Sequence, residues 1–264
     1  MRKCGRFIRP RPPLGKMPRT YKSFPRVFVE STLAAGAVVV LDKDQANHLV
    51  NVLRLKEGDA VVLFNGRDGA WLGKITHAGK KGATIALDVQ VAHQTPPSDL
   101  WFGFAPLKVG RLDYLVQKAT EMGAGTIQPV ITKFTQARTK ADKLEAYVLE
   151  AAQQCEVLTV PRLAPEIALT ALLESWRQSQ GLRRLLLADE AAGSSSPVEQ
   201  ISWLKGLPVG ILIGPEGGFS DEERALLLSQ DFVVPISLGP RILRADTAAV
   251  AALALVQAII GDWR

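Results

Sequence analysis

The fold is decided by one stretch of sequence, Ile211-Leu212-Ile213-Gly214-Pro215-Glu216-Gly217-Gly218-Phe219-Ser220. Residues 209–213 are a short apolar run that ends at Gly-Pro, which predicts a strand buried on both faces. The glycines permit positive φ and allow the backbone to approach a ligand without an intervening Cβ. Ser220, followed by Asp221-Glu222-Glu223, predicts a helix N-cap with a capping box. This order of strand, loop and helix indicates a ligand site at the carboxyl end of a sheet.

The first glycine loop differs from the familiar phosphate-binding motifs. It lacks the spacing G-x-G-x-x-G of dinucleotide sites. Elsewhere, Gly73…Gly79-Lys80 has the wrong spacing for a Walker loop and is followed by Lys81 rather than Ser or Thr. Glu216 and the acidic residues after Ser220 already satisfy the helix N-terminus, so a phosphate is disfavoured. The loop instead favours a ligand that offers hydroxyls, amines or a positive charge.

A second glycine loop follows further along the chain, at Leu238-Gly239-Pro240-Arg241-Ile242-Leu243-Arg244-Ala245-Asp246-Thr247. With the first loop, it resembles the RsmE family of ribosomal RNA uridine-N3 methyltransferases, which belong to the SPOUT (trefoil-knot) superfamily. The resemblance covers most of the chain from Arg26 onward, and includes Lys118-Ala119-Thr120-Glu121-Met122-Gly123 and Glu150-Ala151-Ala152-Gln153-Gln154. The two loops are highly specific as a pair, whereas either loop alone is only suggestive.

The resemblance implies an α/β fold, with a C-terminal trefoil-knotted SPOUT methyltransferase domain that has a mostly parallel sheet, preceded by a small PUA-like β-barrel domain. It implies transfer of a methyl group from S-adenosyl-L-methionine to N3 of one uridine of 16S ribosomal RNA in the small ribosomal subunit (uracil 1498 in the family). It also implies a homodimer formed through the C-terminal domain, and that the chain after Ile213 threads through a loop. Periodicity alone predicts only an open, doubly wound sheet, because knots are rare.

Composition divides the chain into four segments. Residues 1–25 are basic and rich in proline, without the apolar region of a secretory signal, and are predicted to be a disordered extension. An RNA-binding arm is the alternative for this segment, and Met17 is a second candidate for the start of the protein. Residues 26–91 carry short strand-like runs and form the predicted barrel. Residues 92–99 are a polar linker with two prolines, and strands alternate with helices over residues 100–264.

Hydrophobic patterning predicts the main elements of both domains. In the first domain, Asp44 is predicted to cap a helix over residues 45–55, with Leu49, Val52 and Leu53 facing inward. Strands are predicted over residues 60–64, 70–76, 84–91, 100–105, 126–131, 183–188, 209–213 and 232–236. Helices are predicted over residues 111–122 and around residues 144–155. A closing helix, capped by Asp246 or Thr247, ends near residue 260 and is too short to span a bilayer.

Composition and charge exclude few functions on their own. The chain has 264 residues, of which 47% are hydrophobic and 22% charged, as in an ordinary soluble globular protein. The first 26 residues hold nine Lys or Arg and no acidic residue, whereas the remainder has 23 basic and 26 acidic residues. Evidence for nucleic-acid binding must therefore come from local clusters of basic residues, because the net charge of the chain mostly reflects its N-terminus. The two cysteines and three scattered histidines match no disulfide or metal pattern, and a cytoplasmic protein is expected.

The resemblance places the methyl donor between the two glycine loops. Backbone polar groups and an apolar slot for adenine are expected from residues of both loops and of the strand before the first. The predicted donor-binding residues are Leu212, Ile213, Gly214, Pro215, Glu216, Gly217, Gly218, Leu238, Gly239, Ile242 and Leu243.

Two charged residues are predicted to take part in catalysis. Uracil N3 is a poor nucleophile until its proton leaves, so the site must stabilise negative charge on the flanking carbonyl oxygens. Arg244 is the first choice for this role because a guanidinium offers a fixed fork of donors, and Arg241 is the second choice. Glu216 is predicted to bind a ribose hydroxyl or loop amides, or to accept the N3 proton. A purely structural role, bracing the loop, is an equal alternative for Glu216.

Basic side chains are predicted to bind the substrate RNA, with an ordinary solvated surface as the alternative. They are Arg241, Arg244, Lys118, Lys108, Arg111, Arg54, Lys80 and Lys81. One segment departs from the family, which has a Glu-Gln pair followed by Arg where this chain has Gln153-Gln154-Cys155-Glu156-Val157. The contact made by that arginine is therefore missing or relocated.

Two other functions stay open, namely the same chemistry on another RNA such as transfer RNA, and a non-catalytic RNA-binding ribosome-assembly factor.

Overall fold

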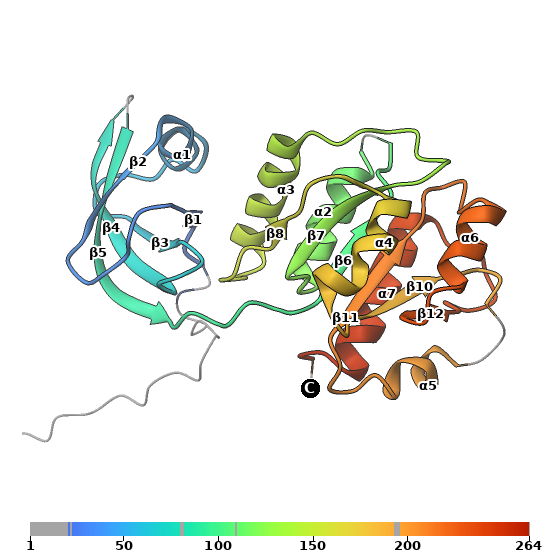
Figure 1. Ribbon diagram of the computed structural model, residues 1–264. Helices are drawn as coiled ribbons and strands as arrows, with labels where there is room; N and C mark the ends of the chain where they lie inside the picture. The colour runs from blue at the N-terminus through green and yellow to red at the C-terminus, as the bar shows by residue number, and fades with distance from the viewer. Residues whose placement is uncertain (1–20, 22, 80–81, 109, 193–195, 264) are drawn as a thin grey trace, which may run out of the picture. The chain divides into compact units, whose positions relative to one another are not determined.

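The computed structural model describes residue 21 and residues 23–79, 82–108, 110–192 and 196–263. The chain divides into two compact units, Met1–Pro96 and Pro97–Arg264 (Figure 1). No helix in the described part of the chain is long and apolar enough to cross a membrane.

In its described residues, the N-terminal unit is built on a five-stranded sheet in the order β1-β3-β4-β5-β2. The strands are β1 (Arg26–Phe28), β2 (Val38–Leu41), β3 (Ala60–Phe64), β4 (Ala70–Gly79) and β5 (Gly82–Ala92). β1 is parallel to β3, and the other pairs are antiparallel. Alternate residues of β5 (Ala83, Ile85 and Leu87) are buried in one apolar core. The three strands predicted for this region are confirmed as β3, β4 and β5.

The helix predicted over residues 45–55 is wrong in its cap and in its inward face. The N-cap is Asp42, whose Oδ1 accepts a hydrogen bond from the Gln45 backbone N–H at 2.8 Å, and α1 covers Lys43–Asn47. A π-helical turn, η2 (His48–Val52), follows, with the Leu53 N–H donating to the His48 carbonyl. Because a π-turn is wider than an α-turn, positions at its end and after it leave the inward face. Leu49 is buried as predicted, but Val52 is 60% exposed and Leu53 is also exposed.

The C-terminal unit is built on a parallel sheet, in which every strand pair among the described residues is parallel. The strand order is β12-β10-β11-β6-β7-β8, and β9 pairs with β7. The strands are β6 (Trp101–Phe104), β7 (Thr126–Ile131), β8 (Arg162–Leu163), β9 (Ile167–Ala168), β10 (Arg184–Ala188), β11 (Val209–Ile213) and β12 (Val233–Ile236). The five strands predicted for this domain are confirmed.

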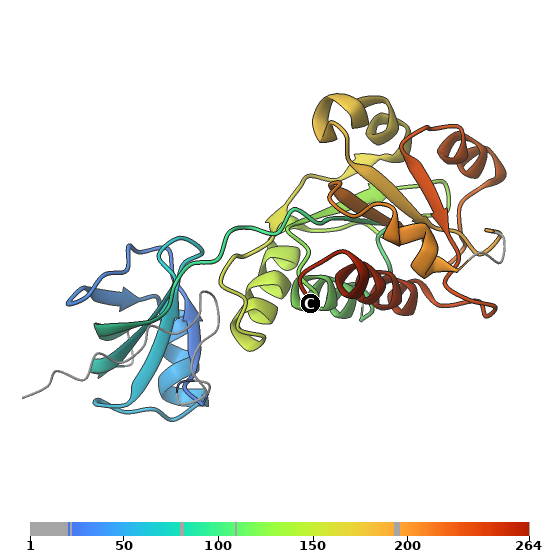
Figure 2. The same ribbon diagram turned by 90° about the horizontal axis from the view of Figure 1, so that it is seen from below.

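Helices cover both faces of this sheet. They are α2 (Leu112–Glu121), α3 (Ala141–Gln154), α4 (Leu169–Gln180), α5 (Pro197–Ser202), α6 (Asp221–Leu228) and α7 (Ala245–Ile259). Figure 2 shows α4 and α6 on one side of the sheet and α2 and α7 on the other. In β11, Ile211 and Ile213 join the core under α2 and α7, whereas Leu212 joins the core under α4 and α6. This three-layer packing is why all of β11 is apolar and buried.

Several elements of the structure were not predicted from the sequence, namely β1, β2, β8, β9, α4 and α5. The start of α4 carries no local signal, because its N-cap is Ala168 and no side chain caps it.

The predicted cap of the closing helix is also wrong. The N-cap of α7 is Arg244, whose carbonyl accepts from the Ala248 N–H at 2.7 Å. Asp246 lies inside the first turn, where its side chain accepts from the Thr247 N–H.

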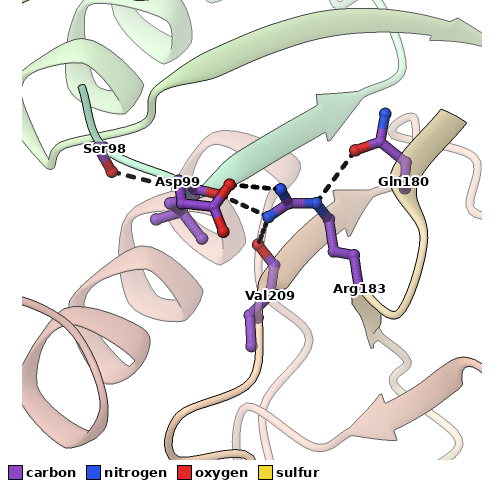
Figure 3. Close-up of polar contacts among 6 residues, drawn as sticks. Ser98, Asp99, Gln180, Arg183 and Val209 are labelled. Atoms are coloured by element: carbon purple, nitrogen blue, oxygen red, sulfur yellow. Dashed lines mark hydrogen bonds and ion pairs between the residues drawn. The ribbon is translucent and has the colours of Figure 1, made fainter.

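One arginine holds together the amino ends of three neighbouring strands (Figure 3). Arg183 precedes β10, and its guanidinium donates to the Val209 carbonyl at 2.9 Å and to the Asp99 carboxylate at 2.6 Å. Its Nε donates to the Gln180 side chain at 3.0 Å. Since Val209 begins β11 and Asp99 lies just before β6, these contacts fasten one edge of the sheet. The opposite, carboxyl edge is where the predicted loops emerge.

Candidate functional site

The two glycine loops leave the sheet at the same edge. β10 lies between β11 and β12, and both are parallel to it, with Leu187 opposite Leu212 and Ala188 opposite Ile236. The loop of residues 214–219 follows β11, and the loop of residues 237–244 follows β12. The carboxyl ends of neighbouring parallel strands are where ligands bind in open α/β sheets. The topology therefore brings the two loops to the same edge of the sheet, as the family resemblance implies.

The first loop is a tight turn whose backbone faces outward. The Gly218 N–H donates to the Pro215 carbonyl at 2.9 Å, and Gly218 has φ of +69°. Pro215 is buried, while Glu216 and Gly217 are exposed. The expectation of positive φ holds only for Gly218. Gly214 is required for a different reason, because a Cβ there would lie 2.8 Å from the ring of Phe219.

The second loop combines an open glycine with apolar side chains. Gly239 has φ of +102°, and its N–H donates to the Ser237 hydroxyl at 3.3 Å. Leu238 and Leu243 are half-buried and pack against the core under α7. Ile242 is 85% exposed, so the fold itself does not use its side chain.

Three predicted charged residues stand free at this edge. Arg241, Arg244 and Glu216 are exposed, and within the described residues no hydrogen bond or ion pair engages their side chains. Arg244 begins α7 through its backbone alone, without a side-chain cap. All three side chains are thus available to a bound molecule.

The helix after the first loop is capped as predicted. The Ser220 hydroxyl accepts from the Glu223 N–H at 3.3 Å, and the Glu223 carboxylate accepts from the Ser220 N–H at 3.0 Å. A hydrogen bond with Ser220, with a further contribution from Lys133, lowers the pKa of Glu222 to about 2. The start of α6 therefore carries charged carboxylates at neutral pH, which disfavours a bound anion there.

An ion pair that sequence reasoning missed joins the ends of β10 and the start of α6. Asp189 is 9% exposed and follows β10, and Arg224 lies on α6. Arg224 Nη2 donates to Asp189 Oδ2 at 2.8 Å, and its Nε is 3.2 Å from both carboxylate oxygens. These hydrogen bonds raise the pKa of Arg224 above its ordinary value. The only sequence signal was an acidic residue directly after a predicted buried strand.

Replacing Asp189 with alanine is expected to lower the free energy of unfolding by about 1–2 kcal/mol, because the Arg224 guanidinium loses its buried partner but keeps partial contact with water. Urea unfolding followed by circular dichroism measures this. Arg177→Ala is the matched control, since its pair with Asp231 has side chains 44% and 78% exposed and contributes at most about 1 kcal/mol. Equal unfolding midpoints for the wild type and Asp189→Ala would contradict a stabilising ion pair.

The other predicted RNA-binding residues are spread over both units. Lys108 is exposed in the connection between β6 and α2, and Arg111 is the N-cap of α2. Lys118 already has partners, since its ammonium lies 2.6 Å from a Glu121 oxygen and 5.5 Å from the centroid of the Tyr114 ring. Arg54 is exposed in the N-terminal unit, with φ of +59°. Lys80 and Lys81 lie outside the described residues.

Family models match both units of the chain. One, described as an RNA methyltransferase domain, matches residues 94–257, and another, described as an RNA methyltransferase PUA domain, matches residues 41–88. The α/β sheet, its two glycine loops and these matches define the class, an RNA methyltransferase domain preceded by a PUA domain.

Known proteins with the same organisation are similar over nearly the whole chain. Ribosomal RNA small subunit methyltransferase E from Rickettsia conorii is 35% identical over 88% of this chain and 94% of its own length. The chain belongs to the ribosomal RNA small subunit methyltransferase E family.

Two solved structures share the fold. The family member from Neisseria gonorrhoeae, bound to S-adenosyl methionine, has a TM-score of 0.76 and 25% identity, and the match covers 91% of this chain and 100% of that one. A putative methyltransferase from Legionella pneumophila, solved with S-adenosyl methionine, has a TM-score of 0.76 and 29% identity, covering 89% and 97% of the two chains.

Proposed function

We propose that the protein transfers a methyl group from S-adenosyl-L-methionine to N3 of one uridine in the 16S ribosomal RNA of the small ribosomal subunit. The observation that carries this proposal is the meeting of two glycine loops at one edge of a parallel sheet, in a chain of this family. A ribosomal substrate places the reaction in the cytoplasm.

The residues of the two loops fit such a donor. Nothing lies within 4 Å of the position that a Cβ would take at Gly218 or Gly239, and both have positive φ. The backbone is therefore open to a ligand on both loops. Leu238 and Leu243 offer apolar surface for an adenine ring beside them. The acidic start of α6 suits a cationic donor better than a phosphate.

The bound donor would supply an activated methyl group on its sulfonium, so the protein mainly has to position the acceptor and manage its proton. The Arg244 guanidinium donates hydrogen bonds to a uracil carbonyl oxygen and stabilises the charge that spreads there as the N3–H bond breaks. Glu216 is exposed on the loop beside Gly217, where its carboxylate can accept the N3 proton or bind a ribose hydroxyl. In either role it is free of competing protein contacts.

Basic residues outside the loops position the RNA in this proposal. Arg241 lies three residues before Arg244 and contacts the phosphate backbone. Lys108 and Arg111 follow β6, which neighbours β11, so they lie along the same carboxyl edge. The N-terminal unit holds RNA through Arg54, Lys80 and Lys81 of its PUA domain. The boundaries proposed for the segments are residues 1–25, 26–91, 92–99 and 100–264.

We also propose that the C-terminal unit is knotted and that two copies form a homodimer. In such a knot the chain after Ile213 threads through a loop, which keeps the two glycine loops against each other. The outer face of α7 carries small residues such as Ala251, Ala254 and Ala258, which permit close helix packing with a second copy.

The proposal is tested by methylation with labelled S-adenosylmethionine, comparing isolated small ribosomal subunits, naked ribosomal RNA and transfer RNA, followed by mapping of the modified nucleoside. Label at N3 of one uridine of the small-subunit RNA is the expected result. Label only in transfer RNA would support the donor site but contradict the proposed ribosomal RNA substrate. If no RNA is labelled and calorimetry detects no donor binding, a non-catalytic RNA-binding assembly factor would replace the methyltransferase.

A further inference from the structure

An exposed aromatic side chain lies against the first glycine loop. Phe134 is 42% exposed. A Cβ built on Gly217 would lie 3.3 Å from the Phe134 Cβ and 3.7–3.8 Å from two of its ring atoms. Phenylalanine usually loses solvent contact in a folded domain, so a ring left open beside a candidate site needs an explanation.

The backbone on both sides of Phe134 is held in place. The Lys133 N–H donates to the Glu223 carboxylate at 2.7 Å, and the Lys133 ammonium lies 3.2 Å from Glu222. The Thr132 N–H donates to the Thr135 hydroxyl at 2.9 Å, and the Thr135 N–H donates to the Thr132 carbonyl at 3.1 Å. The ring is therefore presented on a fixed turn that is joined to the start of α6.

The sheet order decides from which side Phe134 reaches the first loop. Its loop follows β7, which is separated from β11 by β6 alone, and all three strands are parallel. The strands β10 and β12, whose ends flank the proposed donor slot, lie on the other side of β11. Phe134 thus approaches Gly217 from the flank opposite the second loop.

We propose that the Phe134 ring is the surface on which the target uracil stacks when methyl transfer takes place. This inference rests on the proposed function, because it assigns the acceptor base to one wall of the same site. A phenyl ring has no polar group to read the edges of a base, but its flat face binds the π-face of a base that has been turned out of the RNA. The polar edges of the uracil then remain available to Arg244 and Glu216.

Phe134→Ala and Phe134→Leu are expected to lower kcat/KM for the RNA about 5- to 150-fold, the usual effect of losing one base–aromatic contact, while Phe134→Trp stays near the wild type. Phe134→Leu keeps an apolar side chain but removes the planar ring, so it distinguishes the effect of stacking from the effect of apolar volume. Donor affinity, measured by calorimetry, is expected to be unchanged in all three variants. Leu182→Ala is the matched control, because Leu182 is 74% exposed and lies just before β10, at the amino edge of the sheet.

A second measurement detects stacking directly. RNA with 5-iodouridine at the methylated position is irradiated with the full-length protein, and the cross-linked peptide is identified by mass spectrometry. A cross-link at Phe134 is expected. The inference is overturned if Phe134→Leu keeps wild-type kcat/KM, if donor affinity falls in parallel, or if the cross-link maps elsewhere. Failure of the wild type to methylate any RNA would instead overturn the proposed function.

Discussion

Replacing Arg244 with alanine is expected to lower kcat for methyl transfer about 100- to 1,000-fold, the usual effect of removing one donor that stabilises developing negative charge. The donor affinity and the fold are expected to stay as in the wild type. Arg244 caps α7 through its backbone carbonyl and its side chain has no partner among the described residues, so alanine removes no structural contact. Single-turnover methylation under saturating donor and RNA measures the effect.

Two further variants distinguish a role of Arg244 in the chemical step from simple attraction of the negatively charged RNA. Arg244→Lys keeps the charge but loses the planar fork, and is expected to recover only part of the rate. Arg241→Ala is expected to raise KM for the RNA with little change in kcat, because a phosphate contact binds the ground state and the transition state equally. A wild-type kcat for Arg244→Ala would remove this residue from the reaction.

Replacing Gly217 with valine is expected to abolish detectable binding of S-adenosylmethionine, a loss of at least about 100-fold, because the branched side chain would press against Phe134 and displace the loop backbone that contacts the donor. The first added carbon already lies 3.3 Å from the Phe134 Cβ, closer than a relaxed contact, so valine fits only if the loop or Phe134 shifts. Isothermal titration calorimetry measures donor affinity, and thermal unfolding shows that the fold is retained.

The double variant Gly217→Ala/Phe134→Ala identifies the cause of such a loss. If crowding against Phe134 is responsible, the double variant binds donor better than Gly217→Ala alone. If the added carbon meets the ligand itself, the two variants bind equally weakly. Normal donor binding by Gly217→Val would show that the proposed slot is in the wrong place.

Sequence patterns correctly predicted the features that depend on residues close together in the sequence. The capping box of Ser220 and Glu223 is a contact over three residues, and it is present as predicted. The run of β11 was recognised because a strand buried on both faces needs every side chain to be apolar. The family was recognised because the two glycine loops form a rare pair.

Contacts between distant residues were beyond the reach of such patterns. Asp189 and Arg224 are 35 residues apart, and only the adjacency of β10 and β11 brings them together. Phe134 meets Gly217 across more than 80 residues for a similar reason. The N-cap at Arg244 was also not predicted, because no side chain caps this helix and only the extended backbone of Arg244 marks its start.

By itself, the sequence determined eight of the strands, the two glycine loops and the family, because hydrophobic period, capping and loop composition are properties of short segments. The tertiary structure decided which loops share an edge, which glycines take positive φ, and which side chains stand free beside them. Those features depend on the order in which parallel strands pair, and strand order is set by packing of the whole domain.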